Sequence, residues 1–128
     1  MTEAKHRTIT LTDRPPVRIR EDAWPIIARA SDWDGEFEFQ ANRKWTIIVR
    51  QNREDGRTIV YGLSESQFPG EMDLRCGELL TPPEGTVIVE EAWFLHDDLV
   101  GAIHRVAERC GCSCIADACI ADLPAQEL

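Results

Sequence analysis

The sequence predicts an α+β fold, in which an antiparallel sheet of three to five strands carries an N-terminal helix and two C-terminal helices packed on one face. Residues 36–62 contain short runs rich in β-branched and aromatic residues, which is typical of an antiparallel meander. A helix-like stretch precedes them at 20–30, and apolar residues at helical spacing follow after residue 97. With 128 residues, the chain is expected to form a single α+β domain, 1–128.

The first 30 residues predict one strand and one helix. Residues 8–12 alternate threonine with apolar residues, which favours a half-buried strand, and two prolines then end it. Residues 20–30 have an acidic pair suited to an N-cap and a proline suited to a first helical turn. A short helix is therefore expected here, with one buried face made of Trp24, Ile27 and Ala28.

The predicted meander has three strands. Residues 36–40 alternate strictly and would place Phe37 and Phe39 on one face. Residues 44–50 and 57–61 are β-rich, and the loop between them contains Asp-Gly, a pair that favours a chain reversal. These runs predict three antiparallel neighbours.

The second half predicts mostly loop and helix. Residues 62–86 are rich in glycine and proline and read as loop, whereas 86–90 favours a further strand. The stretch 90–110 has helical spacing throughout, so one long helix is an alternative to a strand or loop followed by a helix. The second alternative is preferred because Asp97 and Asp98 suit an N-cap, and a last helix is expected over 114–123.

Negative charge is concentrated in the second half of the chain. Residues 1–60 carry 11 Lys/Arg and 10 Asp/Glu, whereas residues 61–128 carry 3 and 13. Because opposite potentials steer association, this asymmetry favours a protein partner with a basic surface. The predicted partner-binding residues are acidic side chains of the second half, expected on one exposed face: Glu65, Glu71, Asp73, Glu78, Glu84, Glu90, Glu91, Asp97 and Asp98.

A second candidate surface is basic. Lysine and arginine residues cluster at the strand ends and loop of residues 43–57, and a basic hairpin with aromatic neighbours is an alternative site for DNA or RNA. The net charge of −9 opposes polyanion binding in general, so any such contact would be local. The predicted nucleic-acid residues are Arg43, Lys44, Arg50, Arg53 and Arg57.

The chain has 5 cysteines, four of them close together near the C-terminus. Thiolates at such spacing can bind zinc or copper(I), so a thiol-based metal or redox protein is a third hypothesis, with the ligands Cys110, Cys112, Cys114 and Cys119. The preferred interpretation is structural, because the spacing departs from that of zinc knuckles and no histidine lies nearby.

No residue pattern indicates catalysis. The sequence contains no ordered Ser-His-Asp set, no phosphate-binding glycine loop and no zinc-protease motif. The expectation is a non-enzymatic protein with no catalytic residues and no cofactor. The N-terminus is polar and no apolar run is long enough for a membrane span, which predicts a cytoplasmic protein with reduced cysteines.

Three stretches resemble a known group. Residues 10–19, 24–31 and 119–128, together with the meander at 45–61, resemble small uncharacterised accessory proteins of proteobacterial plasmids and integrative elements. This resemblance implies a mobile genetic element as the context and action on host defence, plasmid maintenance or transfer by binding another macromolecule. It assigns no functional residue.

The leading hypothesis is therefore an accessory protein that acts by protein–protein contact through its acidic second half, for example as an inhibitor of a host nucleic-acid-binding or defence system. The alternatives are a nucleic-acid-binding regulator and a thiol-based metal or redox protein. Composition does not determine the oligomeric state, and a homodimer is compatible with it.

Overall fold

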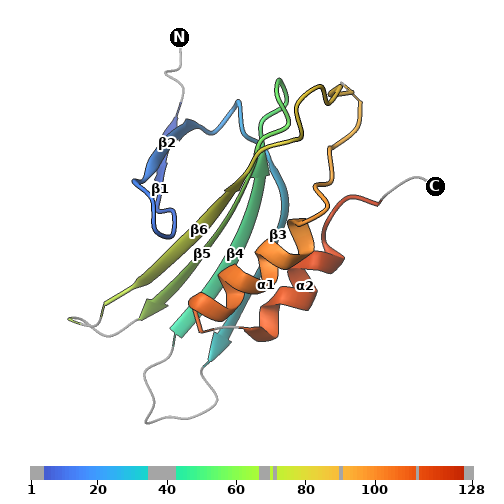
Figure 1. The fold of residues 1–128 in the computed structure, drawn as a ribbon. Helices are drawn as coiled ribbons and strands as arrows, with labels where there is room; N and C mark the ends of the chain where they lie inside the picture. The colour runs from blue at the N-terminus through green and yellow to red at the C-terminus, as the bar shows by residue number, and fades with distance from the viewer. Residues whose placement is uncertain are drawn as a thin grey trace.

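The computed structural model describes residues 5–34, 43–66, 70, 72–89, 91–111 and 113–125, with only the backbone of residues 33 and 34. A four-stranded sheet lies in the middle, two helices lie on one face, and a small hairpin lies on the other (Figure 1). The elements are, in order, β1 (His6–Ile9), β2 (Val17–Arg20), β3 (Ile26–Asp34), β4 (Arg43–Gln51), β5 (Thr58–Ser66), β6 (Leu74–Leu80), α1 (Leu99–Arg109), the 3-10 helix η1 (Ser113–Ile115) and α2 (Ala116–Ala121).

The main sheet is an antiparallel meander with the strand order β3-β4-β5-β6. Its registers place Ile47 beside Gly62 and Gly62 beside Cys76, so these residues face the same side. Strands β4 and β5 coincide with the β-rich runs of the sequence, although each extends beyond the predicted bounds.

The helices cover one face of the sheet and enclose the larger core. Helix α1 contacts β4, β5 and β6, whereas α2 contacts β3 and β4. The buried side of α1 is apolar, and Ile103 and Val106 on this helix are fully buried. They pack in one cluster with Ile47, Val49 and Val60 of the sheet, so burial of this face holds the helix layer to the meander.

The hairpin β1–β2 packs on the opposite face and forms a smaller second core. This core consists of Ile9, Leu11, Ile19, Trp24 and Ile59. The loop between the two strands is tied to the sheet, because Thr12 N–H donates to the Gly77 carbonyl at 2.8 Å and Gly77 N–H donates to Thr12 Oγ1 at 3.2 Å.

The predicted N-terminal helix at 20–30 is wrong. Residues 21–24 form turns, and β3 begins at Ile26 and pairs with β4. A register irregularity between Ile26 and Ala28 lets the consecutive residues Ile27 and Ala28 both be buried. Such a bulge interrupts strand alternation and resembles helical spacing in the sequence. The described chain is therefore mostly sheet, with helices only near the C-terminus.

The predicted loop at 62–86 is also wrong over much of its length. Strand β5 continues to Ser66, and β6 occupies residues 74–80. Two glycines that suggested turns lie inside these strands, where a neighbour leaves no room for a side chain. A Cβ at Gly62 would lie 2.9 Å from Cys110 Sγ, and one at Gly77 would lie 2.6 Å from the Thr10 carbonyl oxygen.

Four further predictions concern the remaining segments. The strand predicted at 86–90 is not formed, because residues 86–89 pair with no strand in the described chain. Helix α1 begins after Asp98, as the capping argument predicted, although this side chain makes no capping hydrogen bond. The predicted last helix at 114–123 is shorter and consists of η1 and α2. The strand predicted at 36–40, with Phe37 and Phe39, lies outside the described residues.

Candidate functional site

The face of the main sheet opposite the helices is only partly covered. Side chains alternate between the two faces of a strand, and cross-strand neighbours share a face. We call the uncovered part the open sheet face. From the strand registers, it consists of Arg29, Ser31, Lys44, Thr46, Ile48, Leu63, Glu65 and Arg75.

Several arginine side chains on this side of the molecule lack a carboxylate partner. Arg18 lies on the hairpin, whereas Arg29 and Arg75 lie on the open sheet face, and all three are exposed. Within the described chain, none of their guanidinium groups makes a hydrogen bond or an ion pair. Guanidinium groups without a protein partner are available to bind an anionic ligand.

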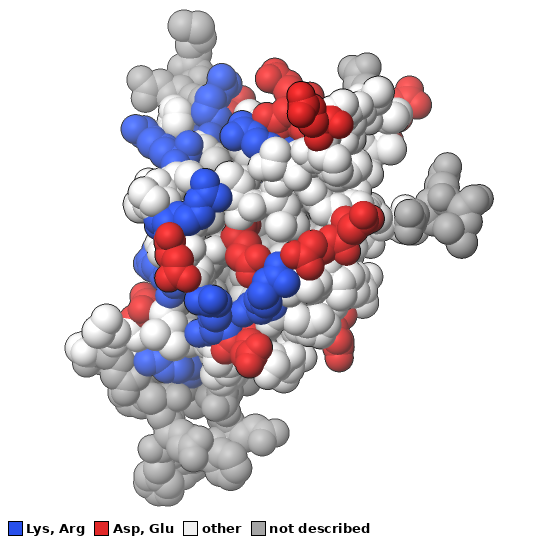
Figure 2. Space-filling view, viewed as in Figure 1, with Lys and Arg blue, Asp and Glu red and all other residues white. Residues whose placement is uncertain are grey.

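The other arginines of strands β1 and β2 are paired. Arg7 Nε donates to Glu21 Oε1 at 2.8 Å, and Arg20 donates to Asp22 Oδ2 at 2.8 Å. The hydrogen bond from Arg7 is the main cause that holds the pKa of Glu21 below its usual range. Figure 2 shows Lys and Arg side chains gathered over the hairpin side of the molecule, whereas most Asp and Glu side chains in view lie elsewhere.

A small cleft of about 60 Å³ lies where the hairpin meets the open sheet face. Arg7 lies on its hairpin wall, whereas Tyr61, Leu63 and Arg75 line it from the sheet. Two arginine residues, one from the hairpin and one from the sheet, therefore line one small recess. Sequence reasoning missed this arrangement, because the arginines that form it come from β1 and β6, far apart in the chain.

The structure does not bring the predicted basic residues of 43–57 together. Arg50 is buried, with 6% of its surface exposed. Its Nε donates to the Tyr61 hydroxyl at 3.0 Å and its NH1 to the Trp24 carbonyl at 3.0 Å, while Glu21 lies 3.9 Å from its NH2. Arg50 therefore joins the hairpin to the sheet and is not available to a ligand.

The other four residues of this set lie at opposite ends of the β4–β5 hairpin. Arg43 is at the start of β4, beside Lys44, and donates to the Ser64 hydroxyl and to the Met72 carbonyl. Arg53 lies in the turn at the other end and stacks on Trp93 with 4.0 Å to the ring centroid. Arg57 beside it donates to Asp55 Oδ2 at 2.7 Å. They do not form one basic surface.

The predicted acidic residues are likewise divided. Glu65 and Asp73 lie at one end of strands β5 and β6, and Ser66 N–H donates to Asp73 Oδ1. Glu84, Glu91 and Asp97 lie in the segment that follows β6 and precedes α1, at the other end. Glu71 and Glu90 lie outside the described residues.

Two acidic residues of the set are paired with one arginine. Arg105 of α1 contacts Glu78 Oε1 at 2.8 Å and Asp98 Oδ2 at 2.6 Å. The hydrogen bond from Arg105 lowers the pKa of the Asp98 carboxyl. The carboxylates of Glu78 and Asp98 together raise the pKa of Arg105. Glu78 and Asp98 therefore belong to a clamp between β6 and α1.

The cysteines are mostly part of the core. Cys76, Cys110 and Cys119 are buried, Cys114 is exposed, and Cys112 lies outside the described residues. Burial raises the pKa of the Cys119 thiol to about 12, which opposes thiolate formation. Cys76 lies next to Cys110, and a hydrogen bond from Cys110 lowers the pKa of Cys76. In the described chain, no group of three or more His, Cys, Asp or Glu is arranged to hold a metal ion.

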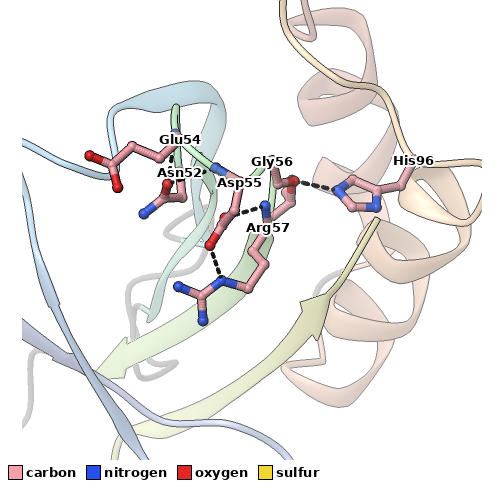
Figure 3. Close-up of polar contacts among 7 residues, drawn as sticks. Asn52, Glu54, Asp55, Gly56, Arg57 and His96 are labelled. Carbon is pink, nitrogen blue, oxygen red and sulfur yellow. Dashed lines mark hydrogen bonds and ion pairs between the residues drawn. The ribbon is translucent and has the colours of Figure 1, made fainter. Parts of the chain in front are cut away.

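A buried polar network supports the β4–β5 turn. Asn52 Oδ1 accepts the backbone N–H groups of Glu54 and Asp55, and His96 Nε2 lies 2.9 Å from the Gly56 carbonyl (Figure 3). The same His96 nitrogen lies 2.9 Å from the Thr58 hydroxyl. This network fixes the segment before α1 against the sheet. These hydrogen bonds are made among groups of the chain itself, which favours a structural role.

We expect His96 to make the free energy of unfolding depend on pH. Burial lowers the pKa of His96 below its ordinary value of about 6.5, so the unfolded chain binds the proton more readily. The contribution of His96 to the free energy of unfolding is therefore fully present above about pH 6.5 and is lost as the pH falls below this value. Urea unfolding at pH 7.5, 6.5 and 5.5 measures this slope.

The control compares two histidine variants. His96→Gln should flatten the slope, whereas His104→Gln, at an exposed position of α1, should leave it unchanged. An unchanged slope in His96→Gln would contradict the assignment.

Comparisons with protein-family models, curated proteins and solved structures found no match for this chain. Among the described residues, no helix is both long and apolar enough to cross a membrane.

Proposed function

We propose that this chain is a non-catalytic binding protein whose hairpin and open sheet face take a single-stranded nucleic acid. The observation that carries the proposal is the set of exposed guanidinium groups at Arg18, Arg29 and Arg75, which have no carboxylate partner in the described chain. Phosphate groups are the anions that arginine binds most readily on an extended surface.

The shape of this surface favours a single strand over a duplex. Sequence-specific duplex readers commonly insert a helix or a β-ribbon into a groove. Here the exposed residues of the helix layer include Glu108 and Asp117, which repel phosphate, and the cationic side is a sheet. The open sheet face, with half-exposed Ile48 and Leu63, offers apolar surface against which unpaired bases can pack.

Oligonucleotide binding tests this function. We expect a labelled 20-nucleotide single strand to bind in fluorescence anisotropy at low salt, and the affinity to fall steeply as salt rises. The double variant Arg18→Glu/Arg75→Glu should reduce affinity about tenfold or more, because two phosphate contacts become repulsive.

The control is a double variant that makes the same change in net charge on other surfaces of the protein. Arg57→Glu/Arg109→Glu leaves the hairpin and the open sheet face intact, since these residues lie in the β4–β5 turn and at the end of α1. Equal loss of affinity in both variants would contradict the proposed surface. An absence of binding to single-stranded DNA and RNA at low salt would contradict the function.

A second candidate is contact with a protein partner that has a basic surface, the function that the sequence favoured. Fewer acidic residues support it than the sequence predicted. Within the described chain, Glu84, Glu91 and Asp97 make no hydrogen bond or ion pair with lysine or arginine, and all lie in the segment between β6 and α1. The mobile-element context and the inhibition of a host system stay predictions.

A further inference from the structure

The segment Thr86–Val89 has the composition of a β-strand and no strand partner in the described chain. Its sequence is Thr-Val-Ile-Val, which has high β-propensity. The backbone N–H groups of Val87, Ile88 and Val89 make no hydrogen bond within the described chain, and neither do the carbonyl groups of Thr86, Val87 and Ile88. Unpaired edges of this kind are templates for another strand.

The segment is nevertheless held in place at both ends. Thr86 N–H and hydroxyl both donate to the Pro83 carbonyl, at 3.1 and 2.6 Å, and Ala92 N–H donates to the Val89 carbonyl at 3.2 Å. Between these points, Ile88 packs so closely against Gly56 that no side chain would fit there. The backbone edge is therefore presented by a fixed segment, which lowers the entropy cost of pairing.

The side chains alternate as in a strand with one exposed face. Thr86 and Ile88 are half-buried, whereas Val87 and Val89 are 81% and 59% exposed. Two neighbouring β-branched side chains exposed on the same side provide an apolar surface for alternate side chains of a partner strand.

The charges around the segment indicate the chemistry of the partner. Glu84 precedes it and Glu91 follows it, and neither has a basic partner in the described chain. Beside Thr86 lies a hollow of about 520 Å³ that Leu79 and Leu95 line together with Asp97. An apolar recess with an acidic residue fits the aliphatic stem and charged end of a lysine or arginine.

The same charges disfavour a second copy of this chain. If two Thr86–Val89 segments paired antiparallel about their common centre, Glu84 of one copy would lie opposite Glu91 of the other. Like charges directly opposite each other destabilise a strand pair.

We propose that Thr86–Val89 is a docking edge that accepts an extended, basic segment of a protein partner by strand addition. Backbone hydrogen bonds supply the attachment, Val87 and Val89 contact the apolar residues of the partner, and Glu84, Glu91 and Asp97 select basic residues. The proposal rests on the second candidate function and is independent of nucleic-acid binding on the opposite basic surface.

Titration with model peptides, followed by NMR amide signals of the full chain, tests the docking edge. We expect a peptide of six alternating lysine and valine residues to bind with a dissociation constant on the order of 0.1–1 mM, as befits a short edge. Signals of residues 84–91 should shift, and hydrogen exchange should slow at Val87 and Val89 or at Ile88, according to the edge that pairs.

Two matched peptides separate the contribution of backbone hydrogen bonds from that of charge. The N-methylated form of the lysine–valine peptide keeps its charge and side chains but has no N–H donors, so it should bind at least tenfold more weakly. A glutamate–valine peptide should show no saturable binding. Equal binding of all three peptides, or shifts located away from residues 84–91, would overturn the proposal.

Charge exchange provides the decisive variant. The variant Glu84→Lys/Glu91→Lys should bind the lysine–valine peptide at least tenfold more weakly than the unmodified chain does. It should also gain affinity for the glutamate–valine peptide. Glu65→Lys/Glu108→Lys changes the net charge equally at exposed positions of β5 and α1 and should leave both affinities unchanged. Sedimentation that shows a dimer broken by Val87→Lys would also overturn it, in favour of a second copy.

Discussion

Replacing Ile103 with alanine is expected to lower the free energy of unfolding by about 2–5 kcal/mol. Ile103 is fully buried on α1, in the cluster that joins the helix layer to the main sheet. Removing its methyl groups loses hydrophobic burial and leaves a cavity, and the surrounding β-branched side chains have few alternative rotamers with which to fill it.

Urea unfolding followed by far-UV circular dichroism measures this effect, as a lower midpoint with an unchanged slope. The matched control is Val100→Ala on the same helix, since Val100 is 45% exposed. It should change the free energy of unfolding by less than about 1 kcal/mol. Similar losses in both variants would contradict the packing of α1 on the sheet.

Replacing Arg50 with methionine is expected to lower the free energy of unfolding by about 2–3 kcal/mol. Methionine fills much of the same volume but cannot donate to the Trp24 carbonyl or to the Tyr61 hydroxyl, both 3.0 Å from the guanidinium nitrogens. The buried Trp24 carbonyl then loses its charged donor. Because these hydrogen bonds connect the hairpin to β4 and β5, the hairpin should loosen.

The control is Arg57→Met, which removes a guanidinium from the β4–β5 turn. Its ion pair with Asp55 is solvent-exposed and its contact with the Trp24 ring is 5.2 Å, so a loss below about 1 kcal/mol is expected. Urea unfolding of both variants distinguishes the two. If Arg50→Met were as stable as Arg57→Met, the structural role of Arg50 would be contradicted.

The structural role of Arg50 also affects which variants can test nucleic-acid binding. A joint replacement of Arg50, Arg53 and Arg57 would change a buried structural residue together with surface residues. A loss of binding in that variant would therefore report unfolding as readily as a lost contact. Arg18 and Arg75 are better targets, because their side chains are exposed and make no contact on which the fold depends.

Strands β4 and β5 and the start of α1 were predictable because their signals are local. Runs rich in β-branched residues mark 44–50 and 57–61, and Asp98 precedes an apolar stripe of helical spacing. Strands β3 and β6 were not predictable in the same way. In β3 a bulge disturbs the alternation, and in β6 Gly77 marks the close approach of the hairpin backbone.

In the candidate site, too, local sequence signals were not enough to predict the arrangement. The sequence identified acidic and basic residue sets by their positions in the chain, but surfaces form from residues that are adjacent in space. Glu78 and Asp98 face Arg105, Arg50 is buried, and Arg75 lies beside β1. The sequence predicts a strand at 86–90 from its composition, whereas residues 86–89 pair with no strand in the described chain.

The sequence by itself determined that the chain is acidic overall, that residues 44–61 form a hairpin, and that helices lie near the C-terminus. These features depend on composition and on residues close together in the chain. Only the tertiary structure decided which charges are neutralised and which faces are covered. Antiparallel pairing and helix packing bring together residues that are far apart in sequence, and burial then determines whether a charged side chain joins two elements or remains available to a ligand.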